Sequence, residues 1–128
     1  MADKLKIIII DDEPIVGKRL KPALEKSGYE VEFYENSATA LKRLGEEKFD
    51  IVVTDVRMDE VDGMEILDKV TENRPHVKVI MITGYATIEV AREAIAKGAF
   101  DVIAKPFKPN DLREIIMKAA RALDSNSM

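Results

Sequence analysis

Three carboxylates in this 128-residue sequence stand where two short apolar runs end. Asp11 and Asp12 follow the run Leu5–Ile10, and Asp55 follows Phe49–Thr54. Carboxylates held close together repel one another unless a cation compensates their charge. Oxygen ligands of this kind suit Mg²⁺, with Mn²⁺ as an alternative metal. An aspartate can also attack phosphorus and form an acyl phosphate, so the residues point to metal-dependent phosphoryl chemistry.

A hydroxyl and an ammonium group follow two later apolar runs in the same way. Thr83 comes after Val77–Ile82, and Lys105 comes after Phe100–Ala104. The lysine could pair with one oxygen of a transferred phosphoryl group while the threonine hydroxyl donates to another. Any one such residue at a strand end is usually a helix cap, a turn former or a solvated side chain. Their joint occurrence after four runs is what favours phosphoryl transfer.

The apolar runs alternate with helical patterns, which predicts five strand–helix units. Strands are expected over residues 5–10, 29–34, 49–54, 77–82 and 100–104, the second of them at a sheet edge. Helices are expected from Pro14 to Gly28, from a Ser37 cap to Gly45, around Met64–Val70, over Ala86–Lys97 and from Pro109 onward. This order predicts an α/β fold, a doubly wound, five-stranded parallel sheet with helices on both faces. Ligands bind at the carboxyl ends of such strands, so the fold would gather the polar residues.

The inward faces of two helices can be assigned from their spacing. For the first helix the expected face is Ile15, Leu20, Ala23 and Leu24. For the fourth it is Ile88, Ala91 and Ile95. The compact core is expected to span residues 4–123, with a frayed tail at 124–128.

Composition excludes several classes of function. The formal net charge of -4 argues against a nucleic-acid-binding face. There is no cysteine, and the only histidine, His76, is expected in a distant loop, which argues against zinc or iron. No apolar run approaches the roughly 20 residues that span a bilayer, and the first residues lack a secretory pattern. The expectation is one soluble, cytoplasmic domain over residues 1–128.

At these residues the chain resembles the receiver domains of two-component response regulators. The motifs that carry the resemblance are Ile9-Ile10-Asp11-Asp12-Glu13, Val53-Thr54-Asp55-Val56-Arg57-Met58, Asp62-Gly63-Met64, Ile82-Thr83-Gly84-Tyr85 and Ala104-Lys105-Pro106-Phe107. The segments 83–87 and 94–107 look like receivers attached to ATPase-type transcription activators.

The resemblance implies a role for each residue of the site. Asp55 would be the phosphoacceptor, with a phosphohistidine on a sensor histidine kinase, or a small donor such as acetyl phosphate, as the source. Asp12 and Asp55 would bind Mg²⁺ directly, Arg57 through its backbone carbonyl, and Asp11 through water. The domain would be a regulatory phosphoacceptor, not an enzyme, although it assists its own phosphorylation and slow autodephosphorylation. The bond before Pro106 would be cis.

The resemblance also implies a switch. Thr83 and Lys105 would engage the phosphoryl oxygens and shift the population between two packings. The face formed by residues 86–97, 100–104 and the last helix would then bind an output domain, a target protein or a second copy, without direct contact to nucleic acid or membrane. Gly84 would leave the phosphoryl group accessible, and Arg57 and Tyr85 would tune its hydrolysis.

Two departures and two alternatives stay open at this point. Val102 stands where many receivers have an aromatic switch residue, and Asp59 stands where a proline is common. A phosphatase of the haloacid dehalogenase type would need an acid two residues after its nucleophile, where this chain has Arg57. A receiver-like scaffold that acts without phosphorylation is the non-enzymatic alternative. The chain could stand alone or be a piece of a longer regulator of transcription.

Overall fold

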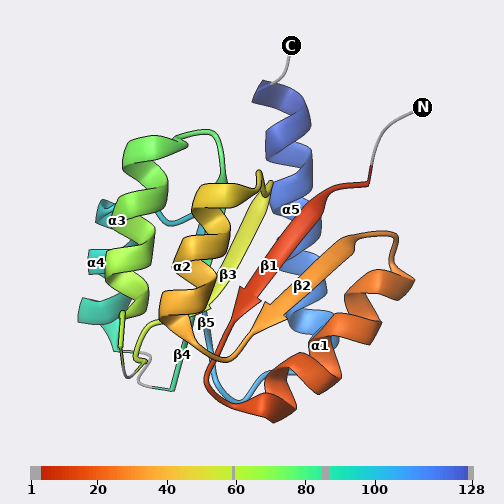
Figure 1. Ribbon diagram of the computed structural model, residues 1–128, viewed down its shortest axis with the longest axis horizontal. Helices are drawn as coiled ribbons and strands as arrows, with labels where there is room; N and C mark the ends of the chain where they lie inside the picture. Colours follow the sequence, from red (N-terminus) through yellow and green to blue (C-terminus); the bar gives the residue numbers. More distant parts are fainter. Residues whose placement is uncertain (1–3, 59, 85–86, 127–128) are drawn as a thin grey trace.

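The computed structural model describes residues 4–58, 60–84 and 87–126, in which five parallel strands alternate with five helices (Figure 1). The strands are β1 (Lys6–Ile10), β2 (Glu30–Tyr34), β3 (Ile51–Asp55), β4 (Lys78–Thr83) and β5 (Asp101–Ala104). The helices are α1 (Pro14–Lys26), α2 (Ser37–Glu46), α3 (Gly63–Asn73), α4 (Ile88–Ala96) and α5 (Pro109–Asn126). The sheet order is β2-β1-β3-β4-β5, so the predicted doubly wound fold is confirmed, with β2 at one edge. None of the described helices is long and apolar enough to cross a membrane.

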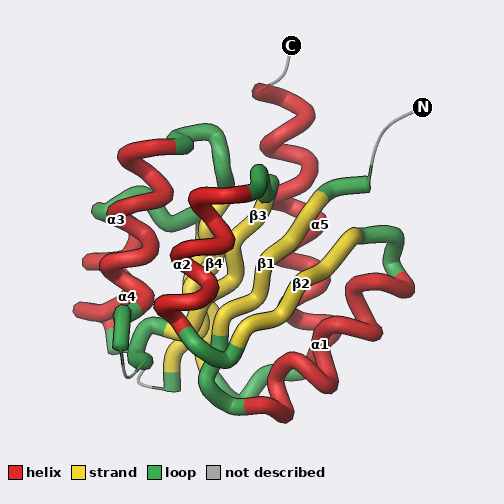
Figure 2. Tube along the Cα trace, viewed as in Figure 1, coloured by secondary structure: helices red, strands yellow, loops and turns green. Residues whose placement is uncertain are grey.

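The sheet is covered on both faces by helices (Figure 2). Ile8 and Ile10 of β1 point into a core built with α2, α3 and α4. Ile7 and Ile9 point the other way, into a core built with α1 and α5. Successive residues of a strand face opposite sides, so a central parallel strand needs apolar residues at every position. The uninterrupted run Ile7–Ile10 meets that requirement, and β1 therefore lies inside the sheet.

Several helix ends differ from the prediction: α4 spans Ile88–Ala96 with Thr87 as its N-cap, and the predicted start at Ala86 lies outside the described residues. Asn36, not Ser37, caps α2: its side-chain oxygen accepts a hydrogen bond from the Thr39 backbone N–H at 2.8 Å. Both residue types cap helices well, so local sequence did not separate them. Helix α2 runs one residue past Gly45, and α5 continues to Asn126, into the segment expected to be frayed.

Two helix faces are also corrected. Ile15 is 50% exposed, and α1 instead buries Gly17, Leu20 and Leu24. Ile88 and Ile95 share one stripe of α4, as their spacing predicts, but this stripe faces solvent with 70% and 51% exposure. Ala94 is the buried residue of this helix. A helix can bury a small side chain where it packs close to the sheet, so hydrophobicity alone did not identify the inward face.

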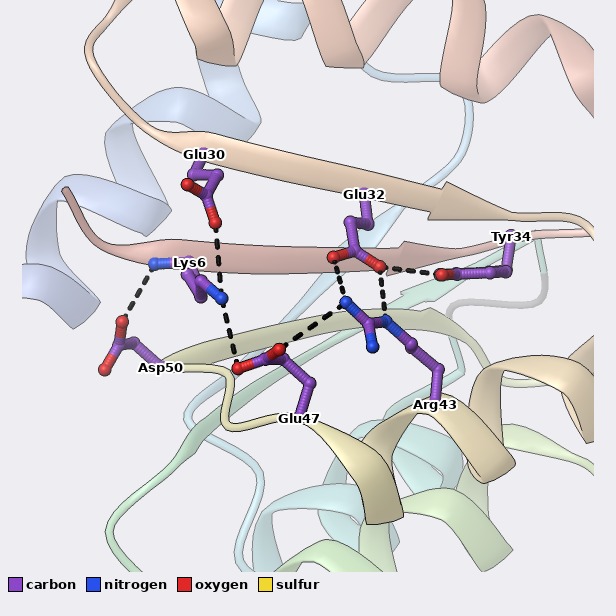
Figure 3. Close-up of polar contacts among 7 residues, drawn as sticks. All are labelled: Lys6, Glu30, Glu32, Tyr34, Arg43, Glu47 and Asp50. Atoms are coloured by element: carbon purple, nitrogen blue, oxygen red, sulfur yellow. Dashed lines mark hydrogen bonds and ion pairs between the residues drawn. The ribbon is translucent and has the colours of Figure 1, made fainter.

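A polar network joins α2 to the edge strand (Figure 3). The Arg43 guanidinium donates two hydrogen bonds to the Glu32 carboxylate, each 2.9 Å long. Lys6 of β1 lies 3.1 Å from Glu47 and 3.4 Å from Glu30. The face of β2 toward α2 therefore carries charges instead of a core, and paired hydrogen bonds hold the helix against the sheet.

The Glu32–Arg43 pair should make stability depend on pH in the acid range. Hydrogen bonding to Arg43 is the main cause that lowers the pKa of Glu32 from 4.5 to about 2. A carboxyl with a lowered folded-state pKa stabilises the fold above pH 4.5, and this contribution is lost as the pH falls toward 2. In urea unfolding, Glu32→Gln should be less stable than the wild type at pH 7, and the difference should shrink steadily below pH 4.5. Exposed Glu46→Gln is the control, and a Glu32→Gln difference that stays constant with pH would contradict the assignment.

Candidate functional site

The polar residues singled out from the sequence meet at the carboxyl-terminal end of the sheet. Asp11 follows β1, Asp55 ends β3, Thr83 ends β4, and Lys105 follows β5. These four strands are adjacent and parallel, so their carboxyl ends lie together. The chain moves outward in opposite directions from β1 and β3, and such switch points are where α/β sheets bind ligands.

The three aspartates form a compact acidic cluster. One carboxylate oxygen from each of Asp11, Asp12 and Asp55 lies within 4.8 Å of the others. Asp11 is fully buried and Asp55 is 7% exposed, whereas Asp12 is exposed. Asp11 is held in place because its Oδ1 accepts a hydrogen bond from the Glu13 backbone N–H at 2.9 Å. The cluster thus combines two fixed carboxylates with one that is open to solvent.

Lys105 supplies the positive charge of the site. Its Nζ lies close to three carboxylate oxygens: Asp11 Oδ2 at 2.8 Å, Glu13 Oε1 at 2.6 Å and Asp55 Oδ2 at 2.9 Å. Burial by itself would lower the pKa of Lys105, but hydrogen bonds to these acids outweigh it and raise the pKa above its usual value. The side chain therefore stays an ammonium group over the whole physiological range.

The charge of Asp11 is only partly compensated. Burial raises the pKa of the Asp11 carboxyl, and the contact with the Lys105 ammonium group opposes this effect. Within the part of the chain that is described, Asp11 Oδ2 is the buried side-chain oxygen that lacks a hydrogen bond of good geometry, although it is ion-paired with Lys105. A buried carboxylate oxygen without such a bond, beside two further carboxylates, fits a hard divalent cation such as Mg²⁺.

Backbone contacts hold Asp55 at the mouth of the site. The Arg57 N–H donates to Asp55 Oδ1 at 3.1 Å, and the Val56 N–H donates to the Ile82 carbonyl at 2.9 Å. The Gly63 N–H then closes the following loop by donating to the Val56 carbonyl at 2.8 Å. These contacts join the end of β3 to β4 and to the start of α3. The Arg57 carbonyl remains a predicted metal ligand.

Gly63 allows α3 to start directly against the end of β3. A Cβ atom at this position would lie 2.0 Å from the Asp55 carbonyl oxygen, which is inside van der Waals contact. Gly63→Ala should therefore push the start of α3 away from Asp55 and lower the free energy of unfolding by about 2 kcal/mol, as overpacking does. Chemical denaturation checks this value. Gly45→Ala is the matched control, because a Cβ there meets nothing within 4 Å, and equal losses in both variants would contradict the steric argument.

The remaining predicted residues lie as follows. Thr83 is 2% exposed, and its carbonyl accepts a hydrogen bond from the Lys105 N–H at 2.8 Å, which links β4 to the lysine loop. Gly84 is exposed. The Lys105–Pro106 bond is cis, as expected. His76 lies in the loop before β4, at the opposite, amino-terminal end of the strands. Asp59 and Tyr85 lie outside the described residues.

Two contacts near the site were not predicted from the sequence. Glu13 contacts Lys105. Its position directly after Asp12 places it near the site, but the sequence analysis assigns it no role. Ser37 is buried, and its hydroxyl accepts a hydrogen bond from the Val61 N–H at 2.9 Å. This hydrogen bond joins α2 to the loop after Asp55, between residues 24 positions apart in the sequence. No local sequence pattern predicts it.

Comparison with known proteins agrees with the geometry. The family model for the response regulator receiver domain matches residues 7–117. The chain is 38% identical over 123 residues to the regulatory protein AtoC of Escherichia coli K12, a match that covers 96% of this chain and 26% of AtoC. It is 37% identical over 113 residues to the response regulator receiver protein CpdR of Brucella abortus, covering 88% of this chain and 94% of CpdR.

Among solved structures, the chain is similar to a CheY-like response regulator receiver domain protein from Methanospirillum hungatei. The TM-score is 0.92 at 32% identity, and the match covers 97% of this chain and 99% of the other. The chain thus spans about a quarter of AtoC but nearly all of CpdR. The strand order, the acidic cluster with its lysine, and these matches lead to one conclusion: the chain belongs to the response regulator receiver domain family.

Proposed function

We propose that Asp55 of this chain accepts a phosphoryl group from a sensor histidine kinase in a metal-dependent reaction, and that the product changes partner binding. A phosphoacceptor role is general to the receiver family. The observation that carries the assignment to Asp55 is its position. Its carboxylate belongs to the three-aspartate cluster and lies 2.9 Å from the Lys105 ammonium. Asp11 shares both features, but its side chain is fully buried, whereas that of Asp55 is 11% exposed and can meet a phosphoryl donor.

The chemistry assigns one task to each side chain. An Asp55 carboxylate oxygen attacks the phosphorus, a new O–P bond forms, and the bond from phosphorus to the donor nitrogen, or to the oxygen of acetyl phosphate, breaks. The product is an acyl phosphate, and the electron pair leaves with the donor. Lys105 stabilises one phosphoryl oxygen by charge, and the Thr83 hydroxyl donates to another.

Receiver domains bind Mg²⁺ at an acidic cluster, and the donor set of this chain fits that ion. Asp12 and Asp55 would hold it directly, Arg57 through its backbone carbonyl, and Asp11 through water, with Mn²⁺ as a substitute. The bound ion would neutralise charge that develops on the transferred phosphoryl group. The incompletely satisfied Oδ2 of Asp11 supports this assignment.

The surface beside Lys105 is suited to receive the kinase. A pocket of about 350 Å³ is lined by Ile15, Lys105, Pro106 and Phe107, among others. Ile15, the second residue of α1, is 50% exposed, so an apolar side chain lies beside Lys105 at the entrance of the site. A kinase domain that carries the phosphohistidine could cover this apolar surface while it presents the donor to Asp55.

A second surface is suited to the output. Ile88 and Ile95 of α4 and Met117 of α5 are exposed apolar side chains on the two helices that flank β5 in sequence. This surface supports binding of an output domain or target protein, or formation of a homodimer, after Thr83 and Lys105 engage the phosphoryl group. We propose that residues 1–128 work as one receiver unit that regulates transcription, and the similarity to the receiver part of AtoC supports this.

Intact mass after brief treatment with acetyl phosphate tests the proposal. The sample is treated with and without Mg²⁺ and quenched in acid, because acyl phosphates hydrolyse. One added phosphoryl group that requires Mg²⁺ is the expected result. If neither acetyl phosphate nor a cognate kinase modifies the protein, and beryllofluoride does not bind either, a phosphorylation-independent scaffold becomes the better account.

A further inference from the structure

Lys105 contacts one carboxylate more than phosphoryl transfer requires. Asp55 is the acceptor and Asp11 belongs to the metal cluster, but the shortest of the three contacts, 2.6 Å, is to Glu13. Glu13 occupies the N-cap position of α1, yet its side chain makes no capping hydrogen bond. It is also absent from the three-aspartate cluster that could hold a metal ion. Neither helix capping nor metal binding therefore accounts for this contact.

The three carboxylates differ in how firmly they are held. The Asp11 side chain is fully buried and that of Asp55 is 11% exposed, whereas that of Glu13 is 56% exposed. An exposed carboxylate can turn into water at little cost, because solvent replaces the lost ion pair. A buried carboxylate cannot do so without losing its only compensation. If one partner of Lys105 must leave, Glu13 leaves most easily.

The number of donors on Lys105 makes its acceptors compete. An ammonium group has three N–H donors, and in the present structure three carboxylates surround it. A phosphoryl oxygen on Asp55 adds a further strong acceptor at the same place. We propose that Glu13 is a positioning residue that competes with the phosphoryl group for Lys105 and thereby weakens binding of that group. The inference rests on the proposed function, because it assumes that Asp55 is the acceptor.

The competition predicts a specific effect of Glu13→Gln. The neutral amide no longer forms an ion pair with Lys105, so the ammonium group is free to meet a phosphoryl oxygen. An exposed ion pair changes an equilibrium constant by roughly two- to fivefold. Affinity for beryllofluoride, a mimic of the phosphoryl group on an aspartate, should rise by about this factor in the presence of Mg²⁺. Affinity for Mg²⁺ without fluoride should stay the same or fall by no more than about fivefold, because Glu13 is an exposed charge near the metal cluster and not a member of it.

The experiment compares the wild type, Glu13→Gln and Glu35→Gln by calorimetric titration of the full chain. Glu35 is an exposed acid that follows β2, at the same carboxyl-terminal end of the strands, and in the described structure no hydrogen bond or ion pair joins it to Lys105. The expected result is tighter beryllofluoride binding for Glu13→Gln alone. Unchanged or weaker binding by Glu13→Gln would overturn the inference, and so would equal tightening by Glu35→Gln.

Three outcomes separate this inference from the function on which it rests. A tenfold loss of Mg²⁺ affinity in Glu13→Gln would make Glu13 a metal ligand and overturn the competition. A wild type that binds Mg²⁺ but no beryllofluoride would overturn the proposed phosphoacceptor function, and the role of Glu13 with it. A wild type that binds both, beside a Glu13→Gln variant with the same affinity, would leave the proposed function intact and remove only the inference.

Discussion

Asp55→Asn should reduce Mg²⁺-dependent phosphorylation below detection while the fold stays intact. The amide nitrogen and carbonyl oxygen cannot attack phosphorus as a carboxylate does, so the nucleophile is lost. The side chain keeps nearly the same shape, and its carbonyl oxygen can still accept the hydrogen bond from the Arg57 N–H. Intact mass after treatment with acetyl phosphate, quenched in acid, measures the result.

The stability of this variant separates loss of chemistry from loss of fold. Without metal, Asp55→Asn removes one of three carboxylates that repel one another, so the free energy of unfolding should fall by no more than about 1 kcal/mol, or rise. Asp68→Asn is the control, because it removes a carboxylate of α3 from a surface ion pair with Lys97, which follows α4. This control should be phosphorylated like the wild type. A phosphoryl group found on Asp55→Asn would defeat the assignment of the acceptor.

Lys105→Met should impair both the chemistry and the stability of the site. Removal of a charge that stabilises the transferred phosphoryl group costs about 100-fold in rate, by analogy with the loss of one oxyanion-hole donor. At neutral pH without metal, the fully buried Asp11 loses its counter-charge, and breaking a buried pair in this way costs about 3 kcal/mol. Single-turnover phosphorylation and urea unfolding measure the two effects.

Mg²⁺ gives a further test of the same variant. With the ammonium group gone, the acidic cluster is more negative and should bind the ion more tightly. A ligand that binds only the folded state raises its stability in proportion to affinity, so Mg²⁺ should raise the melting temperature of Lys105→Met more than that of the wild type. Lys108→Met, at an exposed position of the same loop, is the control. Equal effects of Mg²⁺ on all three proteins would show that Lys105 does not compensate the cluster.

The strands were the best-predicted part of the fold. The runs that became β1, β3 and β4 are apolar at almost every position, and only a strand buried on both faces of a parallel sheet needs that composition. The helix faces were predicted less well, since Ile88 and Ile95 have the right spacing but face solvent. Spacing fixes which residues share a face of a helix, whereas the direction of that face depends on how the helix packs.

The same distinction applies to the site. The sequence by itself determined the α/β fold class, the strand-end positions of Asp11, Asp55, Thr83 and Lys105, and hence their meeting at one edge, because parallel strands end together. Only the tertiary structure decided that Glu13 lies 2.6 Å from a lysine 92 residues away, and that Ser37 holds the loop after Asp55 instead of capping α2. Residue patterns reflect local geometry, and these two contacts depend on side chains from separate elements whose distance is set by packing.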